Sequence, residues 1–66
     1  DAAQVKTLRS SELAAGMVLA RDLIAHDGLL LLAAGQRMEA GMIRRIQDYV
    51  QSEAMDSLRV QVIVDA

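Results

Sequence analysis

Residues 19–35 read LARDLIAHDGLLLLAAG, two apolar runs separated by Asp27-Gly28. Asp-Gly between apolar runs is the strongest short-range signal for a β-hairpin. A two-residue type I′ turn needs positive φ at both central positions, and these two residue types tolerate it. The stretch therefore predicts two antiparallel strands that reverse at Asp27-Gly28, and the other elements are placed around this hairpin.

A two-residue turn also fixes the register of the hairpin. The expected pairs are His26 with Leu29, Ala25 with Leu30, Ile24 with Leu31, Leu23 with Leu32, Asp22 with Ala33 and Arg21 with Ala34. Alternation then places Ile24, Leu29 and Leu31 on one face and Leu23, Leu30 and Leu32 on the other. Both faces are apolar, which is typical of strands covered on both sides. One helix can cover only one face, so the other must meet the terminal strands or a partner.

The residues before the hairpin predict a short strand over 5–9, with Leu8 and Val5 turned inward. Ser10-Ser11-Glu12 follows, where hydroxyl groups can satisfy backbone donors, and a tight or 3₁₀ turn should deliver Leu13 to the core. Gly16 then precedes a long strand expected over 17–25.

After the hairpin the apolar period changes from two to about 3.6. Residues 38–51 (MEAGMIRRIQDYVQ) predict one amphipathic helix, with an apolar stripe of Met42, Ile46, Tyr49 and Val50 that is widened by Ile43. No Ser, Thr or Asn stands at its expected start, so the helix lacks a favourable N-cap. Residues 52–57 predict a loop. Residues 58–64 (LRVQVIV) predict a last strand with Leu58, Val60, Val62 and Val64 on one face.

These elements predict an α+β fold, a small curled and mostly antiparallel sheet of about four strands with a central Asp-Gly hairpin, packed by one helix. Residues 1–66 form a single small domain, and a compact chain of this length has a radius of gyration of about 11 Å. Because the chain begins at Asp1 without a methionine, we expect it to be a fragment of a longer multidomain protein. It is 53% hydrophobic, more than a small monomer easily hides, which indicates a covered surface.

Composition disfavours several functions. Seven Lys and Arg against nine Asp and Glu, with one aromatic residue, do not form the basic, aromatic surface of a nucleic-acid binder. The longest apolar run, residues 29–34, is too short to span a bilayer, and no signal-peptide pattern is present. Without cysteine, neither a disulfide nor a cysteine-based metal site can form. We therefore expect a cytoplasmic protein that contacts neither nucleic acid nor membrane.

The glycine and apolar positions form a recognisable pattern. LRSSELAAGMVLARDLIAHDGLLLLAAGQRMEAGMIRRIQDY fits L-x-x-G-M-V-L-A-x-D-L, then G-x-L-L, a further glycine and an amphipathic helix. This resembles small accessory segments of bacterial HD and HD-GYP phosphohydrolase signalling proteins, most of all the C-terminal segment of two-component response regulators with a receiver and an HD-type domain. Met38-Glu39 stands where Leu-Thr is commoner in that pattern, which removes a helix cap.

The resemblance implies a non-catalytic accessory or interaction domain of a phosphorelay output protein. The fragment itself is not expected to be an enzyme, although the parent may carry a phosphohydrolase domain elsewhere. The expected partners are a second copy or other domains of the parent chain. Two alternatives remain, a module that senses a small molecule or cyclic dinucleotide, and a homodimerisation module of an unrelated cytoplasmic protein. A ligand module predicts a concave pocket lined by arginines, whereas an interaction module predicts an exposed apolar patch.

Four charged residues are candidates for interaction: Arg21, Asp22, Arg44 and Arg45. Arg21 and Asp22 interrupt the apolar sequence of the hairpin, and charges at such a position also discourage edge-to-edge aggregation of strands. Adjacent arginines on a helix, such as Arg44 and Arg45, commonly belong to its solvated side. His26-Asp27 spells HD, but one histidine cannot supply an HD-type metal site, so we interpret His26 as a solvated turn residue. The four methionines are expected either to pack in the core or to form an adaptable contact surface. We assign no catalytic, cofactor-binding or metal-binding residue and expect no cofactor.

Overall fold

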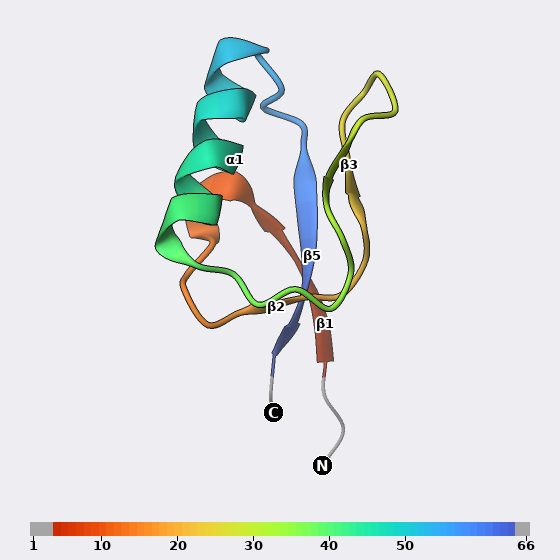
Figure 1. The fold of residues 1–66 in the computed structure, drawn as a ribbon, viewed down its shortest axis with the longest axis vertical. Helices are drawn as coiled ribbons and strands as arrows, with labels where there is room; N and C mark the ends of the chain where they lie inside the picture. The colour runs from red at the N-terminus through yellow and green to blue at the C-terminus, as the bar shows by residue number, and fades with distance from the viewer. Residues whose placement is uncertain (1–3, 65–66) are drawn as a thin grey trace.

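The last strand of the chain is the centre of a three-stranded sheet. In the structure, a computed structural model that describes residues 4–64, β5 (Arg59–Val64) lies between β1 (Gln4–Arg9) and β2 (Val18–Leu19) and is antiparallel to both (Figure 1). The alternating sequence explains this position, because Val60 and Val62 turn to one face and are fully buried there. The predicted strand at the end of the chain is confirmed.

The hairpin forms a separate two-stranded sheet of β3 (Leu23–Ile24) and β4 (Leu30–Leu32). Its turn is not the predicted type I′ turn, which would need positive φ at Asp27. Among the described residues only Ala54 and glycines have positive φ, and Gly28 is one of them at +90°. The Gly28 N–H donates to the Ala25 carbonyl (2.9 Å) and the Ala25 N–H donates to the Leu29 carbonyl (2.8 Å). The loop therefore has three residues and ends on a left-handed glycine, the next most common way to close a hairpin.

The longer loop changes the register. Leu23 pairs with Leu32 as predicted, but Ile24 pairs with Leu30 instead of Leu31, so Leu31 is an extra residue in a β-bulge. Because a bulge re-aims side chains, Leu30 turns outward with Ile24, while Leu31 and Leu32 are both partly buried. The predicted sides of Leu30 and Leu31 are therefore wrong.

The strand predicted over 17–25 is divided into β2 and β3, which join different sheets. The break lies at Arg21-Asp22, where the predicted pairs with Ala33 and Ala34 are absent from the ladder. The Asp22 carboxylate accepts the Ala34 N–H (2.8 Å) in place of a backbone carbonyl. A side chain that satisfies a backbone donor lets the ribbon leave one sheet and start another.

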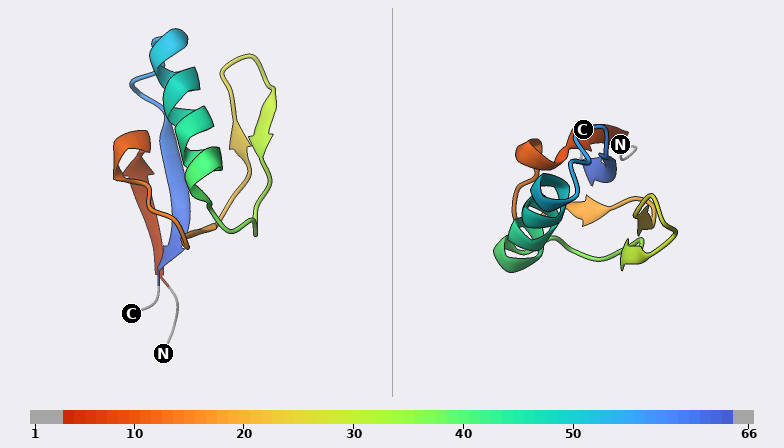
Figure 2. Two further views of the ribbon diagram at one scale, coloured as in Figure 1. Left: turned by 60° about the vertical axis from the view of Figure 1, so that its left-hand side comes forward. Right: turned by 90° about the horizontal axis from the view of Figure 1, so that it is seen from above.

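The helix α1 spans Ala40–Ser52, close to the prediction of 38–51. Glu39 occupies the N-cap without a side-chain cap hydrogen bond, in line with the missing Ser, Thr or Asn. Met38 lies before the helix, and its side chain is buried. Two backbone hydrogen bonds fix its position: its N–H donates to the Met17 carbonyl (2.6 Å), and its carbonyl accepts the Gly16 N–H (2.9 Å). Figure 2 shows α1 over one face of the three-stranded sheet with the hairpin beside it.

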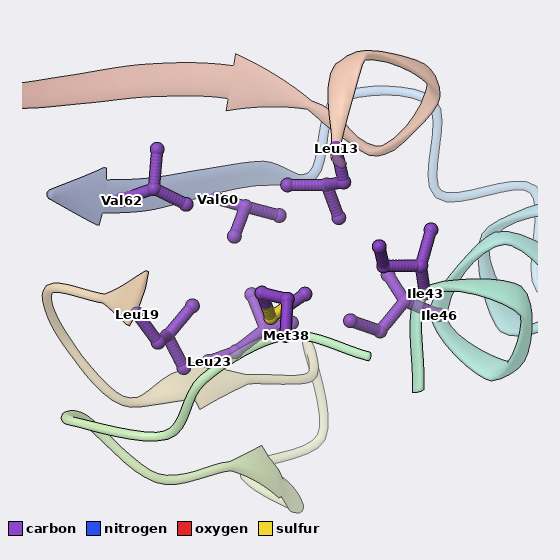
Figure 3. Close-up of a cluster of buried hydrophobic side chains, with 8 residues drawn as sticks. All are labelled: Leu13, Leu19, Leu23, Met38, Ile43, Ile46, Val60 and Val62. Atoms are coloured by element: carbon purple, nitrogen blue, oxygen red, sulfur yellow. The ribbon is translucent and has the colours of Figure 1, made fainter. Parts of the chain in front are cut away.

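Eight apolar side chains from all parts of the fold form the core (Figure 3). They are Leu13, Leu19, Leu23, Met38, Ile43, Ile46, Val60 and Val62. Leu13 follows the 3₁₀ turn η1 (Ser10–Glu12), as predicted, and Leu8 packs against the cluster. Val5 is 59% exposed, so the prediction that it turns inward is wrong, and its register opposite Ile63 explains why. Directly paired residues share a face, and this face is opposite the core.

Residues 4–64 thus form an α+β structure with one α-helix and five strands in two antiparallel sheets, neither of them closed. The α+β class with a central hairpin and one packed helix is confirmed, and the radius of gyration is 11.4 Å. The strands are distributed over two sheets because the bend at Arg21-Asp22 separates them.

Two glycine substitutions should have opposite effects on stability. A Cβ added at Gly28 or at Gly41 would meet no atom within 4 Å, so the two positions differ mainly in backbone conformation. Gly28→Ala should destabilise the fold by about 1 kcal/mol because φ at Gly28 is +90°. Gly41→Ala in α1 should stabilise it by about 0.5 kcal/mol, because alanine is the better helix former. Urea denaturation of both variants measures this, and two changes of the same sign would contradict the role of the left-handed turn.

Candidate functional site

A groove of about 230 Å³ lies between α1 and the hairpin. Its walls come from two elements: Leu31 and Leu32 belong to β4, and Met42, Arg45, Ile46 and Tyr49 belong to α1. The helical residues are spaced three or four apart, which places them on one face of the helix. The two consecutive leucines can both line the groove because the bulge at Leu31 breaks the alternation of β4.

The tip of the hairpin contacts the chain beyond the helix. The helix ends with Ala54 in the left-handed region and a hydrogen bond from the Met55 N–H to the Val50 carbonyl (2.9 Å). This turn brings the Met55 sulfur within 3.2 Å of His26 Nδ1. His26 is exposed, and its one polar side-chain contact in the described part of the chain is this sulfur. The tip of the hairpin is therefore in contact with the turn that follows the helix.

The pKa of the Tyr49 phenol is influenced by a charge in the hairpin. Burial, reinforced by the negative charges of Asp27 and Glu53, raises the pKa of Tyr49 above its ordinary value of 10.0. The carboxylate of Asp27 at the hairpin tip thus contributes to the electrostatic environment of Tyr49. Tyr49 is also the single aromatic residue of the sequence, so its absorbance and fluorescence report on this groove alone.

The raised pKa of Tyr49 predicts a pH effect on stability. The folded chain binds the phenolic proton more tightly than the unfolded chain does, so Tyr49 favours folding below pH 10. That contribution is lost as the pH rises through the raised pKa. Titration of the phenolate absorbance should give a pKa above 10 that Asp27→Asn lowers and Asp48→Asn does not. Tyr49→Phe should remove the loss of folding stability that deprotonation of Tyr49 causes at high pH. A Tyr49 pKa equal to the ordinary value of 10.0 would contradict the partly buried position of the phenol.

The outer face of the hairpin is an exposed apolar patch. It consists of Ile24 and Leu30, which are 44% and 52% exposed, together with Leu29 (56% exposed) at the end of the turn, where it lies opposite the buried Ala25. Ile24 and Leu30 are paired and so share this face, whereas the opposite side of the hairpin, with Leu23 and Leu32, faces the core. Within residues 4–64 no element covers the outer face. The inner side of the hairpin is covered by the rest of the fold, but its outer side is not. The prediction that the second apolar face meets a partner therefore stays a prediction.

The four predicted interaction residues do not converge. All four are exposed, and Arg45 alone among them lines the groove. The carboxylate of Asp22 is engaged by the Ala34 N–H, so its observed role is structural. Arg44 and Arg21 lie outside the lining of the groove. The pocket lined by several arginines that a ligand-sensing module predicts is therefore reduced to a groove with one arginine.

Sequence reasoning missed the lining role of four groove residues, Leu31, Leu32, Ile46 and Tyr49. Tyr49 was assigned to the apolar stripe of the helix, and it is half-buried there. The LLLL run carries no signal that places a bulge at its third leucine. The period of the helix was the available signal, because Met42, Arg45 and Tyr49 recur at helical spacing.

A second hollow, of about 410 Å³, lies at the other side of the helix. It is lined by Arg9, Ser10, Ser11, Val50 and Asp56. No histidine stands beside its serine hydroxyls to act as a general base. Across residues 4–64, no three His, Cys, Asp or Glu side chains are placed to hold a metal ion. No helix in the described part of the chain is both long and apolar enough to cross a membrane.

Comparison of the chain with known protein families, with curated proteins and with solved structures finds no match. The groove and the apolar patch are therefore interpreted from their own geometry.

Proposed function

We propose that the chain is a non-catalytic interaction domain of a bacterial two-component response regulator with an HD-type output domain. In this proposal it acts in the cytoplasm, and its contact surface is the outer face of the hairpin. The family part of the proposal rests on the glycine and apolar pattern of roughly residues 7–49. The interaction part rests on one observation, the exposed patch of Ile24, Leu29 and Leu30.

The energetics favour a contact at this patch. Each of its side chains is about half exposed, and covering the remaining half contributes roughly 1 kcal/mol per residue. Three exposed aliphatic side chains within one hairpin are more typical of an interface than of a solvated surface. The domain therefore works by docking, on a second copy or on another domain of its parent.

Two measurements test the proposal separately. Sequencing the transcript on both sides of the segment should find, in the same reading frame, a receiver domain with its phosphoacceptor aspartate and a domain with clustered His and Asp metal ligands. A reading frame with neither would overturn the response-regulator assignment. Titration of the purified segment into those domains, and into itself, should give binding that Leu30→Ser weakens. Binding to neither would overturn the interaction role.

A small-molecule sensor is the second candidate, because Arg45 places one cation in an otherwise apolar groove. The groove of about 230 Å³ is smaller than the roughly 300–1,000 Å³ of small-molecule pockets, and a cyclic dinucleotide needs several cations for its phosphates. Calorimetric titration with a cyclic dinucleotide separates the two candidates. Binding that Arg45→Gln abolishes and Arg44→Gln preserves would favour the sensor.

A further inference from the structure

The groove between α1 and β4 presents one charge and five largely apolar side chains. Its walls are Leu31, Leu32, Met42, Ile46 and the ring of Tyr49, with the guanidinium of Arg45 among them. Arg45 is exposed, and the arginine side chains that donate hydrogen bonds within residues 4–64 are those of Arg37 and Arg59. A guanidinium stays charged at any physiological pH and offers a planar set of donors to a carboxylate. The chemistry that complements this groove is an aliphatic group with a carboxylate beside it.

The size of the groove favours side chains over a free ligand. A volume of about 230 Å³ corresponds to roughly eight water-sized units, enough for one or two aliphatic side chains. Pockets for whole small molecules are larger, and interface hot spots are commonly filled by single anchor side chains. The occupant is therefore best sought on a protein surface.

The chain itself carries that chemistry at the tip of its hairpin. Asp27, Leu29 and Leu30 are all exposed, with only Gly28 between the acid and the leucines. Asp27 Oδ1 accepts the Leu29 N–H (3.1 Å), which fixes the carboxylate beside the leucines and leaves lone pairs for a second donor. Asp22 and Ile24 have the same spacing, but the Asp22 carboxylate accepts the Ala34 N–H at the base of the hairpin, and Leu58 near Asp56 is packed against the core.

The hairpin cannot fill the groove of its own chain. Its inner side already forms one wall through Leu31 and Leu32, whereas Leu30 is paired with Ile24 on the opposite, outer face. The hairpin and α1 stand side by side (Figure 2), and residues of both line the groove. A second copy can bring its outer face to this groove, and each copy then offers one tip and one groove. Two equivalent contacts related by a two-fold axis close such a pair.

We propose that the groove receives the hairpin tip of a second copy of this chain, with Leu29 and Leu30 against the apolar walls and Asp27 against Arg45. This inference rests on the proposed interaction function and names its partner. The groove and the hairpin tip, both open in a single copy, are covered in the pair.

A charge swap tests the pair directly. Arg45→Glu and Asp27→Arg each place like charges together in both contacts, so each variant alone should dimerise at least tenfold more weakly than the unmodified chain. Mixing the two variants creates one original and one reversed contact, and the mixed dimer should recover to within about threefold of the original affinity. Light scattering across a concentration series measures the masses, and Tyr49 fluorescence reports the occupied groove.

Matched controls separate the charge effect from folding. Arg44→Glu changes the neighbouring arginine outside the groove and should leave dimerisation within twofold. Asp27→Asn keeps an oxygen for the Leu29 N–H and should still weaken the dimer, and circular dichroism confirms that each variant is folded. A monomeric unmodified chain, equal effects of Arg44→Glu and Arg45→Glu, or a mixture that stays monomeric would each overturn the proposal. If the chain is monomeric yet binds a domain of its parent through Leu30, the interaction function stands and the second copy is excluded.

Discussion

Leu19→Ala should lower the free energy of unfolding by roughly 3–5 kcal/mol, the largest effect on stability that we expect of any single truncation here. Leu19 is 1% exposed and lies in β2, between β5 on one side and residues 35–36 on the other. Its N–H donates to the Gln36 carbonyl (2.8 Å) and its carbonyl accepts the Gly35 N–H (2.7 Å), so the backbone is fixed on both sides. The surroundings therefore have little freedom to collapse into the cavity.

The size of the domain makes this loss severe. A chain of this length has a total stability of about 3–10 kcal/mol, so the variant should be largely unfolded or close to it. Urea denaturation followed by circular dichroism measures the change, with Leu29→Ala as the control. Leu29 is 56% exposed, and its truncation should cost less than about 1 kcal/mol. Equal losses for the two leucines would show that the core is not centred on Leu19.

Replacing Leu29 and Leu30 together with serine should weaken association by about 2–3 kcal/mol, which is roughly 30-fold to 150-fold in the dissociation constant. The two side chains are about half exposed, so the folded single copy gains little from them and an interface gains much. Sedimentation equilibrium measures the dissociation constant, and chemical denaturation should show nearly unchanged stability.

The matched control for that variant is Val5→Ser. Val5 is as exposed as Leu29 but lies beside Ile63 on the outer face of the three-stranded sheet. It should leave the dissociation constant within about twofold. If Val5→Ser weakens association as much as the double serine variant does, the contact surface is the three-stranded sheet and the assignment to the hairpin is wrong.

Local patterns predicted the elements that obey one period throughout. The strand over 58–64 alternates strictly, and Val60 and Val62 are buried as expected. The helix follows a 3.6-residue period and begins within two residues of its predicted start. Leu13 reaches the core after a 3₁₀ turn because its position follows from local turn chemistry.

The errors share a physical cause, which is competition between alternatives of nearly equal local energy. Asp-Gly suits both a two-residue and a three-residue hairpin loop, and only the longer one leaves Asp27 at negative φ. A run of four leucines pairs equally well in either register, so tertiary packing against the helix decides where the bulge falls. Val5 was misplaced for a similar reason, since alternation alone does not say which face of a short strand is buried.

The same ambiguity limited the prediction of the site. Arg45 could be named from the sequence as a candidate, but its difference from Arg44 depends on which face of α1 meets the hairpin. The apolar ribbon indicated that one of its faces needs a cover from outside the helix. Which leucines form that face depends on the bulge, which places Leu30 outward and Leu31 inward.

The apolar patch of Ile24, Leu29 and Leu30 on the hairpin is the proposed interface. A dilution series followed residue by residue through backbone amide chemical shifts tests it most directly. We predict that the amides of residues 24–30, together with those around Arg45 and Tyr49, shift with concentration in one two-state process, while those of β1 stay constant. Amide shifts that are independent of concentration at every residue, in the absence and in the presence of the parent's other domains, would contradict the claim.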